Sequence, residues 1–547
     1  SADAIRVMSG ARLTTNGANI NVDGSGSGIH FLNTAGDAAG STFRLSGSGN
    51  INVSGNNAAG ITLEGQDSSG NPVQSNANMD TRGSEKLVIN VNDKGGNGIV
   101  TNTSGYVYSG TSVNINSPAG QSALVVKGAT TDIKQTGNLT SSSNASPVVD
   151  LTQLTDPASS VNLINSGKIT ANGSGKAVDA SSHSGKVNVT NSGSGNIKGD
   201  VALGDGSNVI ALKDSSVADG ITTGNGNNAI TVQNSAKLTG TLTAGNGANT
   251  LDLKNTSQTN AVVLGNGGNK VNIYGGTHNG TLTSGSGNDS YTLHAVNVGN
   301  AKPTQSSDAF SKINGGAGTD LLTVTDGSWY TLNDAASIQN MDNLNVEKNS
   351  TFEVKNTDLA LNNAGAGANV VSLDHDSTYF INFDATPTDY RLKQNIRGDG
   401  TIRTNTNGKA FDFDNAAYTR DNFTGTLALG NGQFTVAGDN TSALTNATLQ
   451  LDADGLAILE KDQPTQVIGG LRFNSGTLFV QEDFIGSQEN ALQSHMQVTD
   501  LDISGEGAVH IVANGFDNDY NPQKQLEDLS RKSLLRQDEG NTLVTIV

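Results

Sequence analysis

The chain has 547 residues, contains no cysteine and carries a formal net charge of -19 at pH 7. The lack of cysteine excludes disulfides, thiolate metal sites and cysteine nucleophiles, and the acidic balance disfavours nucleic acid and anionic membranes as partners. Hydrophobic residues make up only 34% of the chain, a fraction compatible with disorder. Apolar and polar residues nevertheless alternate in many short runs, which indicates β-strands. We therefore expect an all-β fold.

The first 200 residues contain strand-like runs at irregular spacings. Val, Ile and Leu occupy every second position in these runs, as at 20–22, 51–53, 61–63, 87–91, 113–115, 161–163 and 187–189. Such alternation is typical of strands with one buried face. The irregular spacing indicates inserted loops.

A stricter repeat occupies residues 199–325 and is marked by Gly-x-Gly with Asn or Asp two residues after the second glycine. The copies begin at positions 204, 224, 245, 265, 285 and 316, so they lie 20, 21, 20, 20 and 31 residues apart. A period near 20 with two or three short strands is one coil of a β-solenoid, in which each coil buries its apolar residues against its neighbours. The sequence therefore predicts a right-handed parallel β-helix over residues 1–395.

The Asn or Asp of each copy is expected to form a structural ladder along the helix. Gly-x-Gly supplies turn conformations that are closed to residues with a Cβ. The amide or carboxylate that follows can bond its own turn or the same position one coil away. The predicted ladder residues are Asn208, Asn228, Asn249, Asn269, Asp289 and Asp320.

The last copy, with Gly315 before it, also matches the calcium-binding nonapeptide Gly-Gly-x-Gly-x-Asp. Calcium sites of this kind need carboxylates stacked on successive coils. Most of the ladder positions are neutral amides instead. We therefore interpret the ladder as structural and expect no metal and no other cofactor.

The step of 31 residues in place of 20 predicts an extra loop within residues 290–314. Residues 300–308 are the natural candidate, and protruding loops often carry recognition. Lys302 in this loop is a candidate ligand-binding residue.

The densest basic run of this acidic chain lies between residues 391 and 409. Strand alternation would place several of its cations on one face, where they would bind a sulfated or acidic glycan. The alternative is scattered, solvated charge. The candidate ligand-binding residues are Arg391, Lys393, Arg397, Arg403 and Lys409.

Two shorter motifs have simpler interpretations. Arg397-Gly398-Asp399 is an integrin-type tripeptide, but it overlaps a Gly-Asp-Gly turn that the fold needs. Asp374-His375-Asp376 is interpreted as a solvated loop rather than half of a catalytic set.

The seven histidines show no metal-ligand spacing, and the regular coils contain no cluster of Asp, Arg and Lys of the kind used to cleave polysaccharides. We predict no catalytic residues.

The C-terminal part has a different character from about residue 396. Larger residues appear, and the stretches 422–436 and 468–479 each predict a pair of strands. Residues 521–536 give the only convincing helix pattern, with Leu526, Leu529, Leu534 and Leu535 at its apolar positions. Because a solenoid needs a cap over its last coil, we predict a cap in residues 396–547 with a short helix near 521–536.

These C-terminal features carry a family resemblance. The pattern Gly398-Asp399-Gly400-Thr401-Ile402, then Phe423-x-Gly425-x-Leu427, then Leu471-x-Phe473-x-x-Gly476-x-Leu478 resembles the autochaperone end of bacterial type V autotransporter passengers. The Asn-, Gly- and Thr-rich coils before it are similar to passengers of the AIDA-like adhesins of enterobacteria. The family's membrane β-barrel translocator is not contained in this chain, so the resemblance implies a passenger alone.

Three functions follow as hypotheses. The resemblance implies export through the outer membrane and display at the cell surface or release, with adhesion to host matrix proteins (fibronectin, laminin or collagen) or to glycosaminoglycans. Self-association between passengers, giving aggregation and biofilm, is the first alternative. A polysaccharide-cleaving enzyme is the least favoured. We expect a binding protein and not an enzyme.

Overall fold

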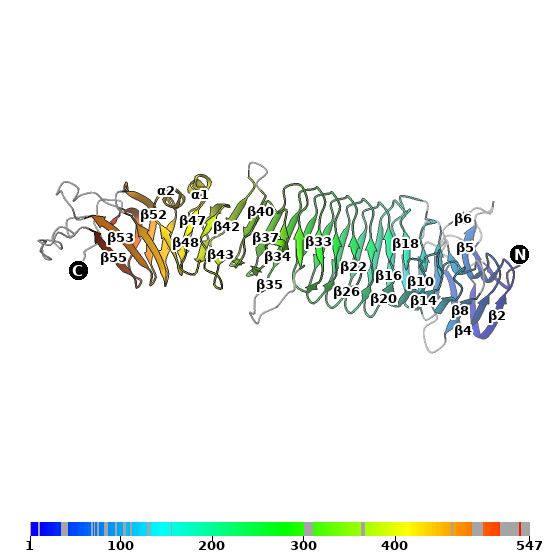
Figure 1. Ribbon diagram of the computed structural model, residues 1–547. Helices are drawn as coiled ribbons and strands as arrows, with labels where there is room; N and C mark the ends of the chain where they lie inside the picture. Colours follow the sequence, from blue (N-terminus) through cyan, green and yellow to red (C-terminus); the bar gives the residue numbers. More distant parts are fainter. Residues whose placement is uncertain are drawn as a thin grey trace, which may run out of the picture. The chain divides into compact units, whose positions relative to one another are not determined.

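The computed structural model describes residues 2–8, 11–33, 42–66, 69, 72–73, 76–80, 86–92, 96–101, 105–109, 112–127, 132–154, 156–299, 310–362, 367–460, 463–483, 496–514 and 535–537. The chain forms two compact units. The N-terminal unit comprises residues 1–290 and 307–318, and the C-terminal unit comprises residues 291–306 and 319–547. Each is built from stacked parallel strands, which confirms the predicted all-β, parallel β-helix class (Figure 1).

In the N-terminal unit, one strand of each coil joins a first sheet. Its strands pair in parallel, apart from β6 (Pro72–Val73), which runs antiparallel to the end of β5. In order of pairing the parallel strands are β1 (Ile5–Met8), β3 (Ser27–Asn33), β5 (Ala59–Gln66), β9 (Asn97–Thr101), β12 (Leu124–Val126), β15 (Val149–Asp150), β18 (Val178–Ala180), β21 (Val201–Leu203), β24 (Ile221–Thr222), β27 (Leu242–Thr243), β30 (Val262–Val263), β33 (Thr281–Thr283) and β36 (Lys312–Asn314).

The remaining strands of each coil form a second parallel sheet. In chain order they are β2 (Arg12–Val22), β4 (Thr42–Val53), β7 (Asn76–Asp80), β8 (Leu87–Val91), β10 (Gly105–Ser109), β11 (Ser112–Ile115), β13 (Asp132–Gln135), β14 (Asn138–Ser141), β16 (Val161–Asn165), β17 (Lys168–Ala171), β19 (Val187–Asn191), β20 (Asn196–Lys198), β22 (Val209–Leu212), β23 (Val217–Ala218), β25 (Ala229–Val232), β26 (Lys237–Leu238), β28 (Thr250–Leu253), β29 (Gln258–Thr259), β31 (Lys270–Ile273) and β32 (Thr277–His278).

The register stacks like residues on one another inside the coils. Ile210 lies opposite Ile230, which lies opposite Leu251 and then Val271, and each of these side chains is at most 1% exposed. Burial of such a side chain contributes about 1.5–3 kcal/mol. Because every coil repeats this contribution, the alternation seen in the sequence is enough to set the inward face.

The glycines of the Gly-x-Gly turns serve a different purpose from the one expected. From Gly204 to Gly287 none of them lies in the left-handed region, so the prediction that they supply special turn conformations is wrong there. They are needed because successive turns touch. A Cβ on Gly226 would lie 2.1 Å from the carbonyl oxygen of Gly206 on the preceding coil. The left-handed positions fall instead on polar residues after the strand, such as Asp214, Asn234 and Asn255.

The C-terminal unit contains a ten-stranded parallel sheet. Its strands pair in the order β35 (Asn297–Val298), β38 (Trp329–Leu332), β41 (Thr351–Lys355), β43 (Thr378–Asn382), β46 (Thr401–Asn405), β48 (Thr426–Leu429), β50 (Thr448–Leu451), β52 (Gln466–Phe473), β54 (Met496–Asp502) and β56 (Leu535–Gln537). Its core is more aromatic than that of the N-terminal unit, since Tyr330, Phe352 and Tyr379 stack with ring centroids 5.2 and 6.1 Å apart.

Smaller groups of strands complete the coils of the C-terminal unit. One parallel group comprises β37 (Leu321–Thr325), β40 (Asn343–Val346), β42 (Val370–Leu373) and β45 (Asn395–Gly398), and a pair is formed by β44 (Tyr390–Leu392) and β47 (Phe411–Phe413). A four-stranded sheet comprises β49 (Gly432–Thr435), β51 (Gly455–Leu459), β53 (Thr477–Asp483) and β55 (Ala508–Asn514). A 3₁₀ turn, Ala335–Ser337, leads into β39 (Ile338–Gln339), and β34 (Ser290–His294) begins at the last residue of the segment 1–290.

The described residues contain two short α-helices that the sequence did not predict. Helix α1 (Ala416–Asn422) begins after Asn415, whose side chain accepts a hydrogen bond from the Ala417 N–H, and α2 spans Gly438–Ala443. Residues 521–534 of the expected helix 521–536 lie outside the described residues. Its last two residues, 535 and 536, belong to strand β56. Leu535 pairs with Met496 in the ten-stranded sheet, so strand pairing prevails over the helical pattern there. Within the described part of the chain, no helix has the length and apolarity to cross a membrane.

The chain therefore carries the repeat into the C-terminal unit. The predicted boundary at residue 396 and the capping role of residues 396–547 stay predictions. The proposed loop at residues 300–308 lies outside the described residues.

Candidate functional site

The structure places the five basic residues, several of which were expected to share a face, at separate positions. Arg391 lies on β44, Arg397 on β45 and Arg403 on β46, and these strands belong to three different sheets. The three arginines therefore do not share a face, and the binding role of the set stays a prediction. Each coil gives only a few residues to each sheet before it turns, so residues six apart in the sequence reach different sides of the helix. Lys302, the sixth candidate, lies outside the described residues.

Two of these cations, Arg391 and Lys393, do come together. They line a cleft of ≈ 360 Å³ in the C-terminal unit, which we call the Arg391 cleft; its lining residues are Thr357, Asp358, Phe383, Thr388, Asp389, Tyr390, Arg391 and Lys393. Lys393 Nζ lies 3.8 Å from an Asp358 oxygen, and Arg391 Nη2 lies 3.0 Å from Asp414. Both cationic side chains remain more than half exposed, at 63% and 64%. Exposed pairs of this kind hold each other weakly, so both cations can still contact a ligand.

The floor of the Arg391 cleft is aromatic and rigid. Tyr390 is 5% exposed, and its ring lies 5.4 Å from that of Phe383 and 6.2 Å from that of Phe411. Its hydroxyl donates a hydrogen bond of 2.9 Å to Asp358 Oδ1. Burial raises the pKa of Tyr390 well above its usual value, so the phenol stays neutral and orients the carboxylate at the cleft wall.

The charges lining the Arg391 cleft balance, although the whole chain is strongly acidic. Arg391 and Lys393 offset Asp358 and Asp389, whereas the chain has 51 acidic against 32 basic residues. A polar or anionic ligand therefore meets hydrogen-bond donors and acceptors here without the repulsion expected over most of the surface. Chemically, the cleft is suited to binding a polar ligand over an apolar floor.

The tripeptide Arg397-Gly398-Asp399 forms a turn at the end of β45. Gly398 has φ +98°, and a Cβ there would overlap the carbonyl oxygen of Leu373, so the turn requires glycine. Asp399 accepts a hydrogen bond of 3.2 Å from His375, whose side chain is 80% exposed. His375 thus bonds a residue of a neighbouring coil.

The Asn ladder runs through the turns of the N-terminal unit as a chain of side-chain hydrogen bonds. The Nδ2 of Asn208, Asn228 and Asn249 each donates to the Oδ1 of the next ladder residue, at 3.0, 2.8 and 2.9 Å. Each amide also donates to a glycine carbonyl of its own turn. An amide both donates and accepts, so it can pass the pattern from coil to coil.

A carboxylate ends this pattern. Asp289 accepts from both the backbone N–H and the Nδ2 of Asn269, at 2.7 and 2.8 Å. Burial raises the pKa of Asp289, although the bonds from Asn269 oppose the effect. In the C-terminal unit, the Asp320 N–H donates to Asp342 at 2.8 Å. Among the described residues, no group of three or more His, Asp or Glu is placed to hold a metal ion.

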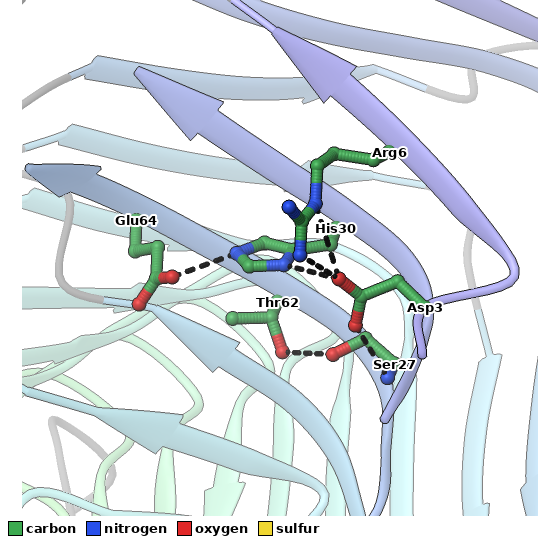
Figure 2. Close-up of polar contacts among 6 residues, drawn as sticks. All are labelled: Asp3, Arg6, Ser27, His30, Thr62 and Glu64. Carbon is green, nitrogen blue, oxygen red and sulfur yellow. Dashed lines mark hydrogen bonds and ion pairs between the residues drawn. The ribbon is translucent and has the colours of Figure 1, made fainter. Parts of the chain in front are cut away.

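A polar cluster on the first three strands of the first sheet was missed by the sequence reasoning. Ile29 and Phe31 on β3 are fully buried, so His30 between them faces outward, beside Arg6 and Thr62 on the paired strands. Figure 2 shows the His30 ring between two carboxylates: Nδ1 lies 2.8 Å from Asp3 and Nε2 lies 2.7 Å from Glu64. Only an alignment of coils 24 and 32 residues apart could have revealed it. The one local signal is a histidine inside an apolar strand.

The geometry of this cluster fixes the charge of His30. A carboxylate only accepts hydrogen bonds, so both ring nitrogens must donate and the imidazole is a cation. The Glu64 bond raises the pKa of His30 most, burial opposes it, and the Asp3 bond adds to the increase. Burial alone would raise the pKa of Asp3, but bonds from the Ser27 N–H, Arg6 and His30 lower it to about 2. With both nitrogens engaged, His30 holds the strands together and has no nitrogen left to act as a base.

These features define a parallel β-helix with a polar cleft on its C-terminal unit. No family model matches the chain. The uncharacterized Escherichia coli K12 protein YuaQ is 37% identical over 160 residues, which are 29% of this chain and 11% of YuaQ. The uncharacterized lipoprotein YdeK of the same organism is 34% identical over 122 residues, 22% of this chain and 9% of YdeK. The chain thus covers about a tenth of the length of these relatives.

Among solved structures, a mutant of the PL6 family alginate lyase AlyGC aligns with 93% of this chain and 100% of that chain. The sequence identity is 9% and the TM-score is 0.17. A likeness this low supports no inference about fold or activity.

Proposed function

We propose that the chain is the passenger of an autotransporter-type adhesin, located at the bacterial cell surface or released from it, that binds host matrix proteins or glycosaminoglycans through the Arg391 cleft. The observation that carries the proposal is the pair Arg391 and Lys393, two exposed cations over a rigid aromatic floor. Aromatic and arginine side chains are the residues most enriched at binding surfaces. The repeating coils support it, because a solenoid offers a long surface for recognition.

Two further observations agree with an extracellular binding role. The chain has no cysteine, so no thiol can form a disulfide during passage through an oxidising compartment. One of the two relatives is named a lipoprotein, which is compatible with a place in the cell envelope.

A binding panel tests the proposal. The full chain is titrated onto immobilised fibronectin, laminin, collagen and heparin, alongside a double variant Arg391→Ser/Lys393→Ser. The matched control is Lys168→Ser/Lys237→Ser, which removes the same charge from two exposed strand positions of the N-terminal unit. We expect at least one panel member to bind, the cleft variant to lose at least about tenfold in affinity, roughly 1.4 kcal/mol, and the control to bind like the original chain. An empty panel, or equal binding by both variants, would contradict the proposal.

Self-association is a second candidate, favoured by an uncharged outward surface on the N-terminal unit. Strands β24, β27, β30 and β33 contain no charged residue, and Thr222, Thr243, Val263 and Thr283 lie side by side along them. Val263 is 41% exposed. Two copies of a chain with charge -19 repel each other, so contact is least opposed where charge is absent.

The test of this candidate uses Val263→Glu and, as control, Gln258→Glu on the second sheet of the same coil region. Displayed on cells, the original chain and the control should clump and the Val263→Glu chain should not. If all three behave alike, this surface does not mediate self-association.

A further inference from the structure

A second candidate site lies on the outward face of the ten-stranded sheet and shares none of the residues that line the Arg391 cleft. The four strands β38, β41, β43 and β46 pair in parallel. Their register places Thr331, Glu353, Phe380 and Arg403 in one outward row, beside a row made of Trp329, Thr351, Thr378 and Thr401. We call Trp329, Glu353, Phe380 and Arg403 the Trp329 platform.

The carboxylate of Glu353 is buried although it faces outward. Its side chain is 6% exposed and accepts three side-chain hydrogen bonds, from Trp329 Nε1 at 3.1 Å, Thr331 at 2.9 Å and Asn382 at 2.8 Å. A buried carboxylate is tolerated when its oxygens are bonded in this way. Glu353 therefore fixes the indole of Trp329, which keeps part of its surface exposed to solvent.

The guanidinium of Arg403 lies over the ring of Phe380, 4.6 Å from its centroid. Other arginines of the C-terminal unit, Arg391, Arg420 and Arg472, each have an aspartate partner. Arg403 has no carboxylate within ion-pair distance among the described residues, and its side chain is exposed. Stacking holds the plane of the guanidinium, so its donors face solvent in a fixed arrangement that matches a carboxylate.

We propose that the Trp329 platform binds an acidic oligosaccharide, with a sugar carboxylate on Arg403 and a sugar ring against Trp329. Strands lie about 4.8 Å apart, so Arg403, three strands from Trp329, is roughly 14 Å away along the sheet. A short oligosaccharide spans that distance, and the threonine hydroxyls between the two ends supply hydrogen bonds to its own hydroxyls. An aromatic platform takes the apolar face of a sugar ring, and the free arginine selects an acidic sugar over a neutral one.

Trp329 gives this proposal a direct reporter, because it is the single tryptophan of the chain. The full chain is titrated with tetragalacturonate and, separately, with neutral maltotetraose, while tryptophan fluorescence is recorded. We expect a saturable change with the acidic sugar and at least about tenfold weaker binding of the neutral one. Arg403→Met, which keeps an aliphatic contact with Phe380, should lose at least tenfold in affinity. Arg472→Met, on the same outward row but paired with Asp502, should bind like the original chain.

Three results would overturn the inference: no fluorescence change with tetragalacturonate, equal binding of the neutral sugar, or unchanged binding by Arg403→Met. Tighter binding of an acidic peptide than of the acidic sugar would assign the platform to a protein ligand and would equally refute it. The site does not depend on adhesion through the Arg391 cleft. The Arg391→Ser/Lys393→Ser chain should show the same fluorescence titration, so the two proposals can fail separately.

Discussion

Replacing one amide in the middle of the Asn ladder should destabilise several coils at once. Asn249 is 1% exposed. It donates to the carbonyls of Gly245 and Gly247 and to the Oδ1 of Asn269, at 2.9, 2.8 and 2.9 Å. Its own Oδ1 accepts from the Nδ2 and the backbone N–H of Asn228, at 2.8 and 3.4 Å. Asn249→Ala removes all five bonds and leaves buried partners without their donor or acceptor.

The cost follows from these contacts. A typical hydrogen bond contributes about 1 kcal/mol net, and a buried group left unpaired costs about 1–3 kcal/mol. Asn228 Nδ2 keeps two glycine carbonyls as partners, so the loss is smaller than the full sum. We expect about 3 kcal/mol, which corresponds to roughly a hundredfold increase in local opening.

Hydrogen exchange measured by mass spectrometry on the full chain checks this value, since a solenoid opens locally and a single midpoint would hide the effect. The increase should be confined to the coils around residues 228–269. The control is Asn279→Ala, an exposed asparagine of the same unit. Exchange in Asn249→Ala that matches the control would refute the reasoning. Asn249→Asp adds a second check, because a carboxylate cannot donate a hydrogen bond. At neutral pH, the coils around the site should exchange their amide hydrogens faster in Asn249→Asp than in Asn249→Ala. Acidification should make the two exchange rates more alike.

Three other outcomes are expected. Gly226→Ala should cost about 1–3 kcal/mol through overpacking, because its Cβ would meet the preceding turn, whereas Gly24→Ala, with no atom within 4 Å, should cost far less. Equal increases in hydrogen exchange in the coils around the two sites would contradict this. The stabilisation of the first three strands of the first sheet by His30 is fully present below its ordinary pKa of 6.5 and is lost as the pH rises through the raised pKa. The stabilisation by Asp3 is lost as the pH falls toward its lowered pKa of about 2. Proteolysis near β1 should therefore be slowest between about pH 4 and 6.5. In the His30→Gln chain, the rate of proteolysis should not rise as the pH becomes alkaline. Finally, burial raises the pKa of three tyrosines, so in alkaline absorbance titration they should ionise only on unfolding: Tyr330, Tyr379 and Tyr390.

The inward half of the fold was predictable because its signal is local. Alternating Val, Ile and Leu specify the buried face, and a period of 20 residues specifies the stacking. The Asn positions were visible for the same reason, since each copy repeats the same spacing. The glycine positions were predicted correctly, but the reason given for them was wrong. They are needed because turns of successive coils touch, and that contact depends on the spacing of the coils, which the sequence of one turn does not show.

The candidate sites were much less predictable, because they depend on which sheet each short strand joins. Arg391, Arg397 and Arg403, close in sequence, lie on strands of three different sheets, whereas Arg391 and Lys393 line one cleft. The His30 cluster joins residues from three coils of unequal length. The strand register decides which of these residues lie side by side. The loops between the strands differ in length, so the register cannot be read from a fixed sequence period.

Burial on the outward side is the feature that distinguishes the Trp329 platform from ordinary coil surface. Alternation alone predicts that outward positions are solvated, and along β24, β27, β30 and β33 most of them are. Glu353 and Phe380 depart from that rule, with 6% and 9% exposure. The coil does not need them for its core, which the inward rings of Phe352 and Tyr379 already fill. Ordering a carboxylate and an aromatic ring on the outside costs side-chain entropy, so this departure from the repeat supports the proposal that the Trp329 platform binds a ligand.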